Sequence, residues 1–264
     1  MSLTRKLRFK LKEFKFFDRL IEVISDEGIV KSIINDESRL ADLSELEKEF
    51  LGELIKNKTP NSIYKSQIGQ DIFTNIILRG KKNGFFIEIG VGDGTYLSNS
   101  YYFEKNKDWK GVLCEPNKDF HEVISGKRNA VLCKDAIYNK SIQNVNLLSV
   151  DEFKEYSTLE MSGENDHINR EKATLQMINT ITFDQLAEMN DLPLDIDYIS
   201  IDTEGSEFEI LSCIDLKKFN VSVFTIEHNY DVIRQNKLKD YLFAHGYKLF
   251  NPILSHFDYW FYKI

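Results

Sequence analysis

Residues 85–94 read FFIEIGVGDG and constrain the fold more than any other stretch of the chain. The run Phe85–Ile89 is apolar except for Glu88, as expected of a strand that is buried on both faces of a sheet. The glycines that follow allow positive φ angles and let the backbone approach a ligand closely. Such a strand and turn typically hold a nucleotide-like cofactor at the carboxyl edge of a parallel sheet, although a tight turn without a ligand is an alternative. The dinucleotide fingerprint Gly-x-Gly-x-x-Gly does not fit, because Thr95 stands where its third glycine belongs.

Composition excludes several classes of protein. The 264 residues and 42% hydrophobic content suit one large domain, or one domain with an extension. A net charge of −8 disfavours nucleic acid as substrate, since a polyanion needs a basic face. The three cysteines are scattered, as in reduced cytoplasmic proteins. We find no membrane span and no secretory signal, and therefore expect a cytoplasmic protein without membrane contact.

The N-terminal segment differs from the rest of the chain. Residues 1–24 carry seven basic and three acidic side chains, with apolar residues at helical spacing from Leu3 to Ile24. Residues 36–57 show a second helical pattern around Leu40 and Leu54. We predict a helical extension over residues 1–60 and a second domain over 61–264. A basic amphipathic helix can lie on a membrane, but packing on its own domain or on a second subunit is favoured, and we expect a homodimer through these helices.

From residue 62 onward strands alternate with helices, which predicts an α/β fold with a mostly parallel sheet. The predicted strands are 85–89, 111–115, 130–134, 145–150, 196–201, 221–226, 247–250 and 257–262, with helices near 97–105 and 231–245. The last two strands form a hairpin, so the final strand should run antiparallel to its neighbours. Residues 151–175 are polar and predict a mobile loop or lid.

Acidic residues stand at the tips of three successive predicted strands. Glu88 ends the first strand, and Glu115 ends the second, about 20 residues after the glycine turn, where an acid can accept both ribose hydroxyls. Asp135 follows the third strand, where it can accept from the adenine amine, and Ala136 beside it leaves space for the ring. The alternative for each acid is a helix cap or a surface position.

The next two strands end in residues suited to catalysis. Asp202 and Glu227-His228 follow neighbouring strands, which lie about 4.8 Å apart in a sheet. They predict either an acid–base pair, with His228 as general base, or a metal site of Asp202, Glu227 and His228. Packing of His228 at a strand end is the alternative. His167, in the predicted lid, is the second candidate base.

The order of these motifs resembles the FkbM family of S-adenosylmethionine-dependent methyltransferases. The matching segments are SQIGQD (66–71), GFFIEIGVGDG (84–94), Ser98-Asn99, LCEPN (113–117), ITFDQL (181–186), YISIDTEGSE (198–207) and TIEHN (225–229). The resemblance implies a class I methyltransferase fold, Rossmann-like, with seven strands in the order 3-2-1-4-5-7-6 and the last strand antiparallel. It implies methyl transfer to hydroxyl oxygen. The implied cofactor site comprises Gln67, Glu88, Gly90, Gly92, Asn99, Glu115, Pro116, Asp135, Ala136 and Asp202.

We therefore predict a bacterial O-methyltransferase that acts on a sugar or nucleotide-sugar hydroxyl in glycan or secondary-metabolite biosynthesis, with a divalent metal as an optional cofactor. Two other classes stay open. An NAD-dependent sugar oxidoreductase or epimerase is disfavoured by Thr95 and by the absence of a Tyr-x-x-x-Lys motif on a suitable helix. A non-catalytic interaction domain of the same fold is disfavoured by the intact glycine turn and by Glu115.

Overall fold

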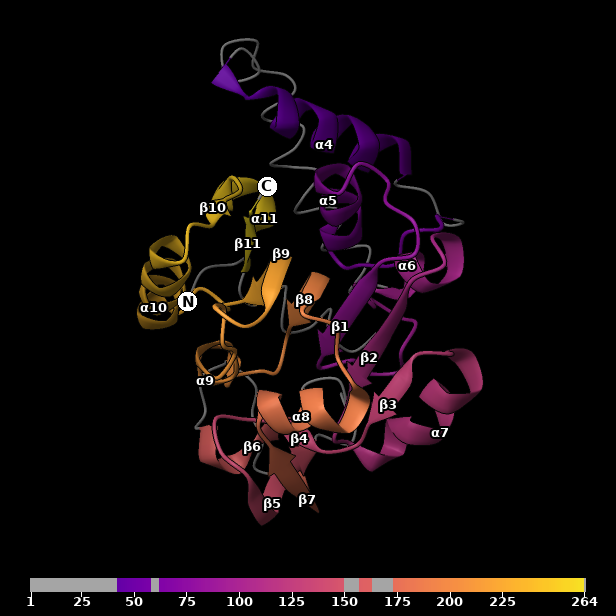
Figure 1. Ribbon diagram of the computed structural model, residues 1–264, viewed down its shortest axis with the longest axis vertical. Coiled ribbons are helices and arrows are strands. Elements are labelled where there is room, and N and C mark those ends of the chain that lie inside the picture. Colours follow the sequence, from indigo (N-terminus) through magenta and orange to yellow (C-terminus); the bar gives the residue numbers. More distant parts are fainter. Residues whose placement is uncertain (1–41, 58–61, 150–156, 163–172, 264) are drawn as a thin grey trace, which may run out of the picture.

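The computed structural model describes residues 42–57, 62–149, 157–162 and 173–263. Its main element is a seven-stranded sheet in the order β10-β11-β9-β8-β1-β2-β3 (Figure 1). The strands are β1 (Phe85–Ile89), β2 (Lys110–Cys114), β3 (Val131–Cys133), β8 (Asp195–Ile201), β9 (Asn220–Glu227), β10 (Lys248–Leu249) and β11 (Asp258–Tyr262). The first five are mutually parallel, and β11 runs antiparallel to both β9 and β10. This confirms the predicted order 3-2-1-4-5-7-6 and the antiparallel final strand.

Helices cover both faces of this sheet, because the central strands are apolar on both sides. In β1, Ile87 and Ile89 face one core cluster and Phe86 faces the other. The first face is covered by α8 (Phe183–Asn190), α9 (Glu207–Ser212) and α10 (Val232–Ala244). The second is covered by α4 (Glu45–Asn57), α5 (Gln70–Ile77), α6 (Tyr101–Asn106) and α7 (Lys118–Lys127). Short α11 (Pro252–Ser255) connects β10 to β11.

Helix α4 belongs to the core of the sheet domain, although it precedes the predicted boundary at residue 60. Phe50 is fully buried and meets Phe250 and Trp260 edge to face, at centroid distances of 5.4 and 5.3 Å. We expected this stripe to be buried against a second copy of the chain. The structure corrects that expectation for residues 45–57, because Phe50 packs against Phe250 and against Trp260 of β11 within the same chain. The helix predicted over Leu3–Ile24 lies outside the described residues.

A second, four-stranded sheet of order β4-β7-β5-β6 lies beside the main sheet, at the end of the molecule opposite α4 (Figure 1). Its strands are β4 (Ala136–Ile137), β5 (Ile142–Ser149), β6 (Thr158–Leu159) and β7 (Thr174–Ile181), with the 3-10 turn η2 (Glu160–Ser162) after β6. Of these, the sequence predicted only β5. The described part of the predicted lid therefore includes a strand, while residues 151–156 and 163–172 lie outside the described residues.

Candidate functional site

One cavity opens at the carboxyl ends of the parallel strands. Nine of the ten residues predicted to contact the cofactor line it, and they come from positions spread over more than 130 residues of sequence. These are Gln67, Glu88, Gly90, Gly92, Asn99, Glu115, Pro116, Ala136 and Asp202. Residues of the second sheet, including Leu147, Thr158 and Leu159, complete the wall.

The glycine turn is fixed by its contact with the neighbouring strand. Gly90 has φ 83°, and a Cβ atom at this position would lie 1.6 Å from the carbonyl oxygen of Asp202. The close approach follows from the backbone hydrogen bond of Asp202 N–H to the Ile89 carbonyl, 2.9 Å long, where β1 and β8 end together. Only glycine allows the turn to pass there.

Glu115 lies beneath this turn. Its Oε2 accepts hydrogen bonds from the N–H groups of Val91 (3.0 Å) and Gly92 (2.8 Å), and its Oε1 accepts from Asn117 N–H (2.9 Å). Glu115 also lines the cavity, and these three bonds hold its carboxylate at the cavity wall. Glu115 thus joins the tip of β2 to the glycine turn at the cavity wall.

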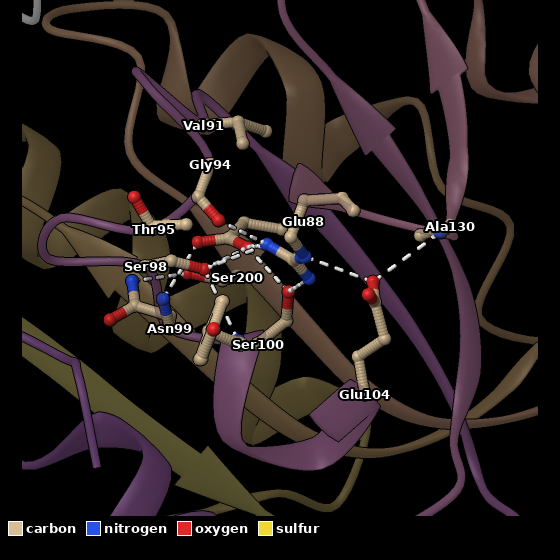
Figure 2. Close-up of polar contacts among 12 residues, drawn as sticks. Glu88, Val91, Gly94, Thr95, Ser98, Asn99, Ser100, Glu104, Ala130 and Ser200 are labelled. Atoms are coloured by element: carbon tan, nitrogen blue, oxygen red, sulfur yellow. Dashed lines mark hydrogen bonds and ion pairs between the residues drawn. The ribbon is translucent and has the colours of Figure 1, made fainter. Parts of the chain in front are cut away.

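Glu88 has a supporting role that the sequence did not indicate. Its carboxylate accepts from Ser98 Oγ (2.9 Å), from the Ser100 hydroxyl and from Asn99 N–H (2.7 Å), as Figure 2 shows. Arg128, whose side chain is fully buried, lies 3.8 Å from Glu88 and also donates to the carbonyl of Gly94 (2.7 Å). These contacts replace the first turn of the helix predicted over 97–105 by a loop, and α6 begins at Tyr101.

Asn99 carries an unsatisfied polar atom at the cavity. Its Nδ2 donates to Ser200 Oγ at 2.8 Å, which orients the amide (Figure 2), while its Oδ1 is buried and has no hydrogen-bond partner in the part of the chain that the structure describes. A buried unpaired oxygen costs free energy unless a ligand or water satisfies it. The site therefore offers a free acceptor to a donor group of a bound molecule.

Two carboxyl groups meet at the far end of the cavity. Asp202 follows β8 and Glu227 ends β9, and a carboxylate oxygen of each lies within 4.8 Å of one of the other. Burial, followed by the negative charge of Glu207, raises the pKa of Asp202 to about 6. Burial, followed by the charge of Asp202, raises the pKa of Glu227 well above its usual range. Both groups are thus held in an environment that disfavours two negative charges.

Asp135 does not lie where the sequence predicted. Among the described residues it lines a separate cavity with Lys118, His121 and Asn179, and its side chain accepts from Asn179 Nδ2 at 3.4 Å. Only the residues after it, Ala136 and Ile137, reach the main cavity. The correction follows from the backbone: β3 ends at Cys133, and β4 then turns the chain into the second sheet.

His228 also does not lie in the cavity, where the sequence predicted it. It is buried to 1% exposure, does not line the cavity and packs edge to face on Tyr259 at 4.3 Å. Its Nδ1 accepts from Tyr230 N–H at 3.0 Å, and burial lowers the pKa of His228 to about 4. Because it directly follows Glu227, its side chain points to the opposite side of the chain. The general-base and metal-ligand roles predicted for His228 are therefore corrected, and His167 lies outside the described residues.

The structure adds Glu204 and Glu207 to the site. Asp202, Glu204 and Glu227 each contribute one carboxylate oxygen to a group in which the three oxygens lie within 4.8 Å of one another. Glu207 Oε1 accepts from Thr203 N–H (3.1 Å) and Gly205 N–H (2.8 Å), and its Oε2 is 2.8 Å from Arg234. Glu207 therefore shapes the loop that carries Glu204. The sequence signal was present in the run Asp202-Thr-Glu204-Gly205, where a second acid follows the first by two residues.

A doubly covered sheet of this order, with a cavity at the carboxyl ends of its parallel strands, defines the fold of the class I S-adenosylmethionine-dependent methyltransferases. The family model described as the methyltransferase FkbM domain matches residues 88–249, and the chain belongs to that family. No curated protein sequence matches it.

Among solved structures, the chain is similar to the precorrin-6y C5,15-methyltransferase from Geobacter metallireducens GS-15. The identity is 15% over 74% of this chain and 79% of that chain, with a TM-score of 0.39. It is also similar to the N-terminal domain of human METTL16 in complex with SAH. There the identity is 12% over 81% of this chain and 78% of that chain, again with a TM-score of 0.39.

Proposed function

We propose that this protein is an O-methyltransferase that transfers the methyl group of S-adenosylmethionine to a hydroxyl of a sugar or nucleotide-linked sugar. The observation that carries the proposal is the arrangement of acids in one cavity. Glu115 follows β2 and Glu227 ends β9, and the glycine turn and Asp202 lie between them at the ends of β1 and β8. Three strand spacings of about 4.8 Å separate β2 from β9, which suits a cofactor at one end and an acceptor at the other.

The cavity wall matches the chemical groups of the cofactor. In the proposed binding mode Glu115 accepts from the ribose hydroxyls, and Pro116 and Ala136, which also line the cavity, contact the adenine ring. The unpaired Oδ1 of Asn99 can accept from the α-amino group of the methionine part. In this assignment Glu88 positions Asn99, and Asp135 plays no part in binding adenine.

The reaction forms a carbon–oxygen bond and breaks a carbon–sulfur bond. The cofactor supplies a methyl group on a sulfonium, whose sulfur keeps the electron pair when the methyl leaves. The acceptor hydroxyl must lose its proton, and carboxylates are suitable proton acceptors when burial raises their pKa, as it does for Asp202. The chain's main contributions are to align oxygen, carbon and sulfur and to receive this proton.

An uncharged sugar ring with free hydroxyls is the reacting group that best suits the acids around Asp202 and Glu227. The net charge of −8 and the acids of the cavity oppose the binding of a nucleic-acid backbone. A cytoplasmic role in glycan or secondary-metabolite biosynthesis is part of the proposal, and the three unpaired cysteines fit a reducing compartment. None of the described helices has the length and apolar character needed to span a bilayer.

The test is methyl transfer from isotopically labelled S-adenosylmethionine to a panel of nucleotide sugars, with the product located by mass spectrometry. We expect label on a sugar hydroxyl. In parallel, Glu115→Ala should weaken binding of S-adenosylhomocysteine, since each hydrogen bond to a charged acceptor contributes about 1.5–3 kcal/mol. Glu122→Ala, an exposed acid on α7, is the matched control and should bind normally. Unchanged affinity in Glu115→Ala would exclude the ribose role.

A further inference from the structure

The three acids Asp202, Glu204 and Glu227 form a cluster of carboxyl groups at the carboxyl ends of β8 and β9. Each of the other buried acids nearby has its own donors. Glu207 is paired with Arg234 at 2.8 Å, and Asp258 accepts from Gln70 Nε2 at 2.9 Å and from Trp260 Nε1 at 3.2 Å. The cluster instead brings three acids together, with one carboxylate oxygen of each within 4.8 Å of the others.

Glu227 provides an independent indication of a missing ligand. Its side chain lines the cavity and the residue is only 7% exposed, yet its Oε2 is fully buried with no hydrogen-bond partner among the described residues. Its neighbour in the cluster is Asp202, a second carboxyl group. A buried carboxylate that faces another acid requires a shared proton or a cation.

Glu204 adds a third carboxylate oxygen to the pair formed by Asp202 and Glu227. Carboxylate oxygens that converge from several segments of a chain are the ligands that hard divalent cations prefer. Glu204 is held toward the cluster by contacts on both its backbone and its side chain. Thr158 Oγ1 donates to its carbonyl at 2.8 Å, and Asn229 Nδ2 donates to its Oε2 at 3.3 Å. Its φ of 57° is uncommon for a residue other than glycine, and such conformations cluster at functional sites.

We propose that Asp202, Glu204 and Glu227 bind one divalent metal ion at the acceptor end of the cavity. A set of oxygen ligands without histidine or cysteine suits the hard cations Mg²⁺, Mn²⁺ and Ca²⁺ rather than Zn²⁺. Water and the acceptor hydroxyl would complete the coordination. This ligand set differs from the one that the sequence predicted, because Glu204 takes the place of His228.

The metal deepens the proposed function, on which its catalytic role rests. A hydroxyl oxygen bound to the cation loses its proton more readily, as metal-bound water does. The proton passes to a carboxylate oxygen of the cluster or to water, and the resulting alkoxide attacks the methyl carbon as the carbon–sulfur bond breaks. Acceptors with two neighbouring hydroxyls, which can chelate the ion, should be preferred.

The test uses the full chain saturated with S-adenosylhomocysteine and titrated with Mn²⁺, whose free-ion electron paramagnetic resonance signal disappears on binding. We expect one Mn²⁺ site per chain, competed by Mg²⁺. Glu227→Gln should weaken Mn²⁺ binding about tenfold or more, through the loss of a charged ligand. Glu209→Gln is the matched control, because it makes the same change in the first turn of α9 but outside the cavity.

Two further readouts, the melting temperature and the binding of S-adenosylhomocysteine, separate the possible outcomes. Glu227→Gln should keep its melting temperature, since it removes one of three clustered acids, and Asp202→Asn serves as the second variant if it does not fold. Calorimetry should show unchanged S-adenosylhomocysteine binding in Glu227→Gln. Absence of a Mn²⁺ site while S-adenosylhomocysteine binds, or equal Mn²⁺ affinity in Glu227→Gln and wild type, overturns the metal site. A Mn²⁺ site without S-adenosylhomocysteine binding supports the metal site and refutes the proposed function.

Discussion

At the scale of single residues, the site depends on side chains and glycines that fix the backbone at the strand ends. Glu88, Glu115 and Glu207 each use their carboxylates to hold a loop through backbone N–H groups. Bonds of this kind are charge-assisted and directional, and they set the positions of the cavity-lining residues before any ligand binds. Preorganisation of this type is what an aligned displacement reaction requires.

Gly90 gives the sharpest prediction at this scale. Gly90→Ala should destabilise the fold by about 2 kcal/mol or more, because the new Cβ would collide with the Asp202 carbonyl at 1.6 Å. Gly52→Ala is the control: it lies in α4 with nothing within 4 Å of the added atom. That change should stabilise the protein by about 0.5–1 kcal/mol through helix propensity. Chemical denaturation of both variants measures these changes in the free energy of unfolding. A Gly90→Ala variant as stable as the unmodified protein would contradict the described turn.

The residues at strand tips also show how far sequence reasoning reaches toward a site. Glu115 and Asp202 were predictable, because acids after buried strands of a parallel sheet must gather at its carboxyl edge. The positions of Asp135 and His228 were not predictable, because successive side chains of a strand face opposite sides. An error of one residue in where the strand ends therefore reverses the side that a side chain faces. Glu204 was missed because its position depends on a left-handed backbone conformation, which the hydrophobic pattern of a sequence does not predict.

At the scale of secondary structure, the two sheets differ in how clearly the sequence encodes them. Strands β1, β8 and β9 are buried on both faces and appear as apolar runs. Strands β5 and β7 carry polar and exposed residues between their buried ones, and β4 and β6 have only two residues each. Their pairing is set by contacts distant in sequence, so the second sheet appears only in three dimensions.

Helix α4 yields the prediction for this scale. Phe50→Ala should lower the free energy of unfolding by about 3–5 kcal/mol, since it opens a cavity beside Phe250 and Trp260. Ile55→Ala, on the exposed side of the same helix at 51% exposure, should change it by about 0.5 kcal/mol or less. Equal free energies of unfolding in the two variants would mean that α4 does not belong to the core. That result would favour the predicted division into a helical extension over 1–60 and a domain over 61–264.

At the scale of the whole molecule, the fold and the family agree that the chain is a class I methyltransferase. The family match over residues 88–249 covers the main sheet from the end of β1 to β10 and all of the second sheet. The proposal of a homodimer now rests on residues 3–24 alone, because α4 is packed within its own chain. Removal of residues 1–41, followed by light scattering, should halve the mass of a dimer and leave the fold intact.

The measurement that tests the central claim most directly is calorimetric titration of the intact chain with S-adenosylhomocysteine and, separately, with NAD. We predict saturable binding of one S-adenosylhomocysteine per chain, through Glu115 and Asn99, and no binding of NAD. Binding of NAD alone would favour a dinucleotide-dependent enzyme and contradict the proposed function. Binding of neither ligand by a folded protein would contradict it too, and would favour a non-catalytic interaction domain.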